Sequence, residues 1–218
     1  MAELILSAHE ARVVAVMVEK SITTPQYYPM TVNAIMMATN QKTSRHPVMN
    51  LTEGDVGAAL NRLDELKLVT RDSFSGRVQK WRQQFMHQLM LKPQTMALLT
   101  TLILRSSQTA AELRANALPL GGPGDADAFS AALADLADRA TPLVVQLPRA
   151  HGQAATRYGH TVCGAQDSVA FETPSATGSV SGGERVDLPA LLARVQALEA
   201  RVGELESQLG ISPATPAD

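Results

Sequence analysis

Cysteine is almost absent from this chain of 218 residues, which contains only Cys163. A single cysteine excludes an intrachain disulfide and a metal site built from several cysteines. The five histidines are scattered, with no H-E-x-x-H motif and no zinc-type Cys/His spacing. The sequence also has no phosphate-binding P-loop and no G-x-S-x-G nucleophile motif. We therefore expect no metal, no cofactor and no enzymatic activity.

Aromatic residues and long hydrophobic runs are scarce as well. With one Trp, four Phe and three Tyr, the core must be built from aliphatic and Met side chains. The most apolar stretch, residues 96–104, contains two threonines and ends at Arg105, and it is too short to cross a bilayer. The first ten residues have an acidic residue at position 3 and no basic segment, unlike a signal peptide. These features predict a cytoplasmic protein without membrane contact.

A strong excess of one charge is missing too. The chain has 19 Lys and Arg against 21 Asp and Glu, whereas a dedicated nucleic-acid-binding domain has a pI above about 9. The charges are nevertheless uneven, since residues 1–90 hold ten basic and eight acidic side chains, while residues 164–218 hold three and eight. Any affinity for DNA must come from local basic patches in the first part of the chain.

The sequence contains the same series of secondary-structure signals twice. In the first copy a Ser7–Glu10 capping box precedes a helix, and Thr31 precedes a second helix. A third helix with an L-x-x-L pattern follows, and residues 69–82 are typical of a strand, a turn and a returning strand. The second copy keeps this order, with a Thr109–Glu112 capping box, a helix at residues 128–139 and an apolar strand. Each copy therefore predicts a winged helix, which is a helix-turn-helix with a β-hairpin appended.

This repeat sets the predicted architecture of the chain. We predict a mainly α fold with small β-hairpin wings (α+β class), with tandem winged-helix domains at residues 1–88 and 89–163. Residues 164–186 are rich in Ser, Gly and Thr and are typical of a flexible linker. A coiled-coil helix at residues 187–210 and a disordered tail at 211–218 complete the prediction.

The predicted C-terminal helix has apolar residues spaced alternately by three and four positions, which is an a/d heptad register. These residues are Leu188, Leu191, Val195, Leu198, Val202, Leu205 and Leu209. Arg194 and Arg201 fall at g positions, and Glu199 and Glu206 fall at e positions, so opposite charges meet only in a parallel pair. We predict a parallel homodimer, and the alternative is a lone helix packed on its own domains.

Three segments of the first copy resemble a known family. They are T-T-P at residues 23–25, N-Q-K at residues 40–42 and G-R-V-x-K at residues 76–80. Together these segments are similar to the YceH family of uncharacterised bacterial proteins. The resemblance implies tandem winged-helix domains and a dimer, but no activity. The chain departs from the family's pattern at Thr39, where Cys is common, and at Trp81, where Tyr is common.

The basic hairpin of the first copy is the strongest functional cue. Against a single acidic residue, Asp72, it carries four basic residues, which are Arg71, Arg77, Lys80 and Arg82. Basic side chains on such a hairpin can contact DNA phosphates or enter the minor groove. The alternative is an ordinary edge strand whose charges prevent sheet-to-sheet pairing.

Two further elements complete the candidate DNA-binding residues. The polar loop at residues 40–50 offers Lys42 and Arg45 to phosphates, although a structural role for this loop is slightly favoured. The third helix offers Asn61 and Arg62 to base edges, but the acidic residues beside them would repel the DNA backbone.

Two functions remain open from the sequence alone. The first is a non-enzymatic, homodimeric DNA-binding or transcription-regulator-like protein that contacts double-stranded DNA through residues 1–88. The alternative is a protein–protein interaction scaffold of tandem winged helices that binds an unknown protein partner and no DNA. The third helix of the second copy exposes mostly Ala, Ser and Asp, which favours a protein partner for that copy.

Overall fold

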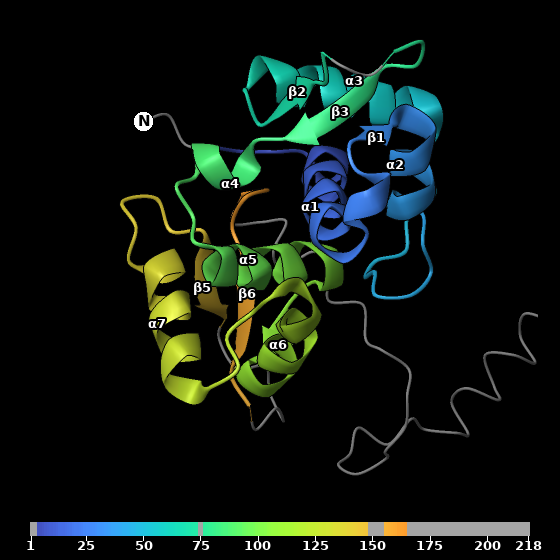
Figure 1. The fold of residues 1–218 in the computed structure, drawn as a ribbon. Helices are drawn as coiled ribbons and strands as arrows, with labels where there is room; N and C mark the ends of the chain where they lie inside the picture. Colours follow the sequence, from blue (N-terminus) through green and yellow to red (C-terminus); the bar gives the residue numbers. More distant parts are fainter. Residues whose placement is uncertain (1–3, 74–75, 148–154, 165–218) are drawn as a thin grey trace, which may run out of the picture. The chain divides into compact units, whose positions relative to one another are not determined.

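Each half of the chain combines helices with a three-stranded antiparallel sheet, as Figure 1 shows. The computed structural model describes residues 4–73, 76–147 and 155–164, and all of them belong to one compact unit. The predicted coiled coil, the tail and the linker beyond Gly164 lie outside the described residues. The predicted α+β class with mainly helical content is confirmed.

The two halves share one order of α-helices and strands, and the first half adds α4 at its end. The first half contains α1 (Ala8–Thr23), η1 (Pro25–Tyr27), β1 (Met30–Thr31), α2 (Val32–Thr39), α3 (Glu53–Glu65), β2 (Val69–Arg71), β3 (Lys80–Gln83) and α4 (Phe85–Gln88). The second half contains α5 (Pro93–Arg105), β4 (Gln108–Thr109), α6 (Ala110–Ala117), η2 (Leu118–Leu120), α7 (Ala126–Ala137), β5 (Val144–Leu147) and β6 (Arg157–His160). The strand orders are β1-β3-β2 and β4-β6-β5, so the last strand is central in both sheets.

Local capping signals start the helices where the sequence predicts. The Glu10 backbone N–H donates to Ser7 Oγ at 3.2 Å, and the Ser7 N–H donates back to the Glu10 carboxylate at 2.9 Å. Reciprocal boxes of the same kind start α3 and α6, and Thr31 caps α2. The start of α7 differs from the prediction by two residues, because Asp125 accepts a hydrogen bond from the Ala128 N–H and begins the helix at Ala126.

Each sheet gains a short strand that the sequence analysis did not predict. Met30 of β1 pairs with Trp81 of β3, and Gln108 of β4 pairs with Tyr158 of β6. Strands of two residues carry too little alternation to be recognised in a sequence. Their effect is to tie the start of α2 and of α6 to the hairpin of the same half.

The two halves are joined through their first helices, α1 and α5, which pack against each other. Residues 11–18 of α1 and residues 95–104 of α5 are buried without interruption, whereas a helix on the surface of one domain buries only one apolar stripe. A helix buried all round lies between two packed layers, here its own half and the opposite half. The predicted division into domains at residues 88 and 89 stays a prediction.

Candidate nucleic-acid interface

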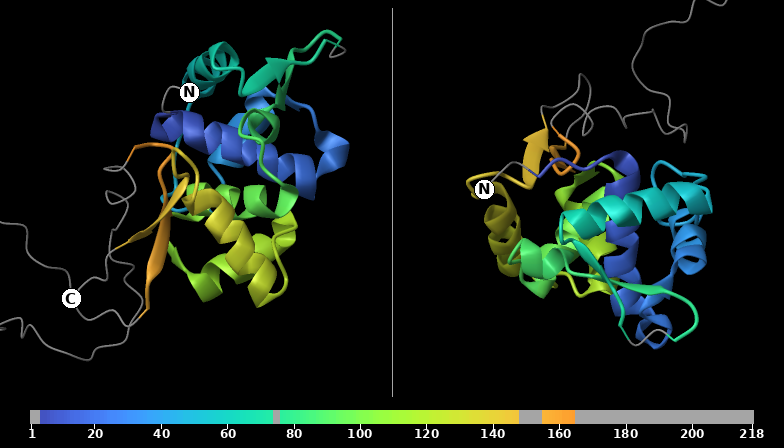
Figure 2. Two further views of the ribbon diagram at one scale, coloured as in Figure 1. Left: turned by 90° about the vertical axis from the view of Figure 1, so that its left-hand side faces the viewer. Right: turned by 90° about the horizontal axis from the view of Figure 1, so that it is seen from above.

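The β2–β3 hairpin carries four of the eight candidate DNA-binding side chains and extends away from the helices, as Figure 2 shows. Arg71 is directly opposite Trp81 in the ladder, so both side chains lie on one face of the sheet. That face is the inner one, because Trp81 is 5% exposed. Lys80 and Arg82 flank Trp81 in sequence and therefore point to the outer face.

Arg71 connects the hairpin to α3. Its guanidinium lies 5.1 Å from the centre of the Trp81 ring, within the range of a cation–π contact. Arg71 Nη2 also donates to Asn61 Oδ1 at 3.4 Å, and Nε lies 3.9 Å from Asp64 Oδ2. Two of the predicted site residues, Arg71 and Asn61, are thus brought together.

Two other predicted arginines have acidic partners within their own element or hairpin. Arg82 Nε lies 2.7 Å from Oδ1 of Asp72, whose side chain is nearly buried. Arg62 Nη1 lies 2.8 Å from Glu65 Oε2 on the exposed surface of α3. The side chains of Arg62 and Arg82 are about half exposed, so water reaches both arginines.

The remaining surface candidates are Lys42, Arg77 and Lys80. Lys42 and Arg77 are exposed and Lys80 is partly exposed. Within the described part of the chain, none of the three has an ion pair with an acidic side chain. An anionic ligand can therefore bind these three side chains without breaking an ion pair of the described residues.

Arg45 corrects the sequence analysis, because its guanidinium is not at the surface. Its side chain is 0% exposed and forms two hydrogen bonds with the Glu19 carboxylate, at 3.0 and 2.6 Å. It also donates twice to the Ala38 carbonyl and once to Gln41 Oε1. Of the two roles considered for this loop, the structural one holds for Arg45, and the residue cannot bind DNA without unfolding the loop.

Tyr28 is a residue of this region that the sequence analysis did not select. Its hydroxyl oxygen accepts a hydrogen bond from the Gln83 N–H at the end of β3. Burial raises the pKa of Tyr28 above its usual value, although this hydrogen bond and the nearby Arg82 charge oppose the rise. Tyr28 therefore anchors the base of the hairpin as a neutral phenol. Nothing in the sequence around Tyr28 indicates its contact with Gln83, which is 55 positions away.

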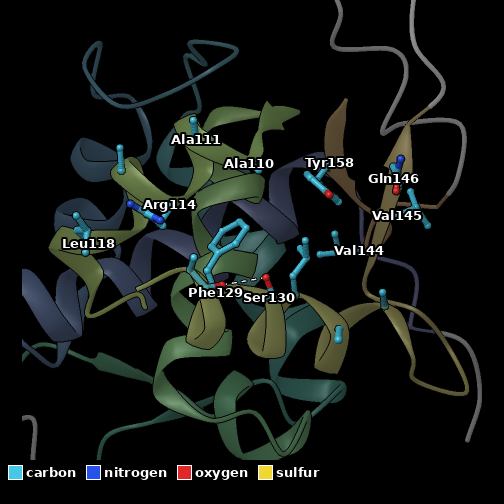
Figure 3. A pocket seen from close by; sticks show the side chains of 15 residues that line it. Ala110, Ala111, Arg114, Leu118, Phe129, Ser130, Val144, Val145, Gln146 and Tyr158 are labelled. Atoms are coloured by element: carbon cyan, nitrogen blue, oxygen red, sulfur yellow. Dashed lines mark hydrogen bonds between the residues drawn. The ribbon is translucent and has the colours of Figure 1, made fainter. Parts of the chain in front are cut away.

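The sequence analysis also missed a groove in the second half. It has a volume of about 830 Å³ and lies between α6, α7 and the β5–β6 strands. Most of its lining is apolar, with alanines from both helices, and Figure 3 shows Phe129 of α7 between Arg114 of α6 and Val144 of β5. Its only signal in the sequence is small residues four positions apart, such as Ala111 with Ala115 and Ala126 with Ser130.

The described residues contain no cluster of three or more His, Cys, Asp or Glu side chains that could hold a metal ion. Cys163 is buried at the end of the second half. None of the helices in the described ranges has the length and apolar character needed to cross a membrane.

Comparisons with known proteins point to one family. The family profile described as "Protein of unknown function, DUF480" matches residues 6–153. A UPF0502 protein of Cronobacter sakazakii is 43% identical over 209 residues, which cover 93% of this chain and 94% of the relative. A UPF0502 protein of Burkholderia orbicola is 41% identical over 220 residues, covering 98% and 93%. The UPF0502 protein YceH of Escherichia fergusonii is 40% identical over 213 residues, covering 94% of each chain.

Proposed function

Because this chain belongs to the DUF480 family of proteins of unknown function, with YceH among its relatives, we propose its function from its own surfaces. The proposal is a non-enzymatic, cytoplasmic DNA-binding protein built from two winged helices. Its first half contacts double-stranded DNA through the β2–β3 hairpin and α3.

The winged-helix assignment is supported by the order of elements. Each half runs helix, short strand, two helices and then a hairpin, with the last strand in the centre of the sheet. In a winged helix the third helix enters the major groove and the hairpin contacts the backbone beside it. The contact between Arg71 and Asn61 holds α3 and the hairpin together as one surface.

One observation carries the DNA proposal, which is the basic outer face of the hairpin. Lys80 and Arg82 point to this face, and Arg77 is exposed nearer the tip. The Arg62–Glu65 pair does not prevent binding, because an ion pair exposed on both sides contributes only about 0–1 kcal/mol. A DNA phosphate can replace the Glu65 carboxylate at little cost. The Arg82 side chain is about half exposed and can contact a phosphate while it keeps its pair with Asp72.

The decisive experiment measures fluorescence anisotropy of a labelled random duplex with the full chain at several salt concentrations. We compare the wild type with Arg77→Gln/Lys80→Gln. Each phosphate contact adds about 0.9 to the slope of log affinity against log salt. The double variant should therefore bind more weakly and lose about two units of slope. Arg82 is left intact, because it pairs with the nearly buried Asp72 carboxylate.

The matched control is Lys92→Gln/Arg114→Gln, which removes two exposed positive charges from the second half. Its net charge equals that of the hairpin variant, so it reports the effect of charge alone. Binding that is absent, or weakened equally in both double variants, would refute the proposed interface.

A second candidate function, a protein-binding scaffold, is favoured by the groove between α6 and α7. An apolar groove lined by small residues accepts an amphipathic helix of a partner. All of the residues that line the groove belong to the second half. The scaffold proposal therefore assigns protein binding to the second half and no DNA binding to the first.

A photo-crosslinking amino acid tests the scaffold proposal in cells. Position 134 lies on α7 in the groove, whereas the exposed position 131 lies on the same helix outside it. A partner in the groove should give an adduct of defined mass from position 134 and none from position 131. Equal labelling at both positions, or no adduct at all, would contradict a groove partner.

We also propose a homodimer held by the heptads of residues 187–210, which lie outside the described residues. Light scattering compares the full chain with a chain that ends at Glu184. The full chain should have twice the mass of a monomer, and the shortened chain should be monomeric. A shortened chain that stays dimeric would place the dimer contact in the winged helices instead.

A further inference from the structure

Arg12 is a buried cation whose hydrogen-bonding groups are only partly used. It lies on α1 and is 2% exposed. Its Nη2 donates to the Pro47 carbonyl oxygen at 2.9 Å. Nε and Nη1 are also buried, and neither has a hydrogen-bond partner among the described residues. A buried donor left without a partner costs about 1–3 kcal/mol, and more when it is charged.

The charge of Arg12 is not balanced by a carboxylate of its own. Burial, together with the nearby Arg45 guanidinium, lowers the pKa of Arg12 to about 10, and Glu19 opposes this change. Arg12 therefore stays charged at neutral pH. Glu19 is already engaged by Arg45 at 2.6 Å and by Lys20 at 3.4 Å, so this one carboxylate faces three cations.

A small cavity adjoins Arg12 at the junction of the two halves. Its volume is about 20 Å³, and its lining combines apolar side chains with Arg12, His46, Ser106, His160 and Cys163. The lining contains no carboxylate. A volume of roughly 10–15 Å³ is the minimum for one water-sized particle, so the cavity admits a single small particle and excludes a tetrahedral phosphate or sulfate.

Ser106 adds a second unusual feature to this cavity. Its backbone has φ 65° and ψ −163°, a region that is strained for every residue except glycine. Strain of this kind persists where the surroundings fix the backbone, often beside a ligand. The strained residue ends α5, and it places a hydroxyl-bearing side chain in the lining beside Arg12.

We propose that this cavity binds one small monovalent anion of chloride size, with Arg12 as its principal ligand. The anion supplies the negative charge that the lining lacks and accepts hydrogen bonds from Arg12. Water of the same size would accept hydrogen bonds but would leave the charge uncompensated. The anion also joins the halves, because the lining comes from α1 and residues 46–49 on one side and from Ile103, Ser106 and the end of the β6 segment on the other.

Thermal unfolding of the full chain tests the proposal in solution. Sodium chloride is raised from 1 to 300 mM, with sodium gluconate holding the ionic strength constant, because gluconate is too large for the cavity. A ligand that binds only the folded state raises stability with the logarithm of its concentration above Kd. The wild-type Tm should therefore rise with chloride, whereas Arg12→Met should show no chloride dependence. Lys92→Met, which removes an exposed cation, should keep the wild-type response.

Anomalous diffraction from crystals soaked in bromide tests the same site without a variant. A bromide peak within hydrogen-bond distance of the Arg12 guanidinium, together with the chloride-dependent Tm, supports the proposal. A water molecule in the cavity with no bromide peak overturns it. A bromide peak without chloride dependence in solution shows binding at crystal concentration only and also overturns it.

Discussion

The Arg45 guanidinium and the Glu19 carboxylate meet edge to edge, with Nη1 3.0 Å from Oε1 and Nη2 2.6 Å from Oε2. This bidentate geometry is the strongest form of an ion pair between these groups. Arg45 belongs to the loop between α2 and α3, and Glu19 lies on α1. The pair therefore holds the loop between α2 and α3 onto the first helix.

Arg45→Met should destabilise the protein by up to about 3–5 kcal/mol, because the Glu19 carboxylate loses its bidentate partner and keeps the longer contact with Lys20 at 3.4 Å. The Ala38 carbonyl would lose its contacts with Arg45 as well. Urea unfolding followed by circular dichroism measures the change. The control Lys42→Met removes an exposed cation of the same loop and should change stability by less than about 0.5 kcal/mol. Equal stability of the two variants would show that the Arg45–Glu19 pair contributes little.

A cavity in α1 should weaken both halves of the chain. Met17 is fully buried on α1, and Met→Ala in a core costs about 2–5 kcal/mol. Because α1 packs against α5, hydrogen exchange in Met17→Ala should accelerate at the amides of α5 and α7 as well as α3. Unchanged protection in the second half would show that the halves unfold independently.

The features that the sequence predicted are those fixed by residues close together in the chain. The capping boxes at Ser7 and Thr109 depend on contacts three residues apart, and the hairpin follows from one turn. The burial of α1 on all sides was missed because a second half covers the face that one domain would leave to solvent. An apolar stripe cannot reveal that partner.

In the candidate site, too, the sequence does not reveal contacts between residues that are far apart in the chain. Arg45 and Arg77 are equally basic in the sequence, but only the structure shows that Arg45 meets a carboxylate 26 positions away. The groove was missed for a related reason, since alanine is compatible with a core, a surface or a pocket. Whether these alanines line a pocket depends on how α6 and α7 are placed.

Arg71→Ala should uncover the only tryptophan of the chain. The Arg71 guanidinium lies over the Trp81 ring, and an exposed cation–π contact contributes about 0.5–1 kcal/mol. Its loss should shift the fluorescence emission to longer wavelength and lower stability by a similar amount. Lys80→Ala is the control, because Lys80 lies on the opposite face of β3. Identical emission spectra for wild type and Arg71→Ala would contradict the stacked geometry.

The capping box of α6 should make stability depend on pH. The hydrogen bond from the Thr109 backbone N–H lowers the pKa of Glu112 below its usual value, with smaller help from the Thr109 hydroxyl and Arg157 and against a cost of burial. A carboxylate whose pKa is lower in the folded state stabilises the protein above the unfolded pKa of about 4.3. This contribution is lost as pH falls through the folded pKa. Glu112→Gln keeps a cap acceptor but cannot ionise, so the wild type should be more stable at pH 7 by up to about 1 kcal/mol.

Urea unfolding of both proteins between pH 7 and pH 3 measures this difference, which should shrink to near zero at the acid end. Asp138→Asn is the matched control, because the Asp138 side chain has no ion pair or hydrogen bond with the part of the chain that the structure describes. Its stability difference from the wild type should not follow the same curve. A Glu112→Gln difference that stays constant from pH 7 to pH 3 would mean that the carboxylate acts through packing alone, since only an ionised group loses its effect when it takes up a proton.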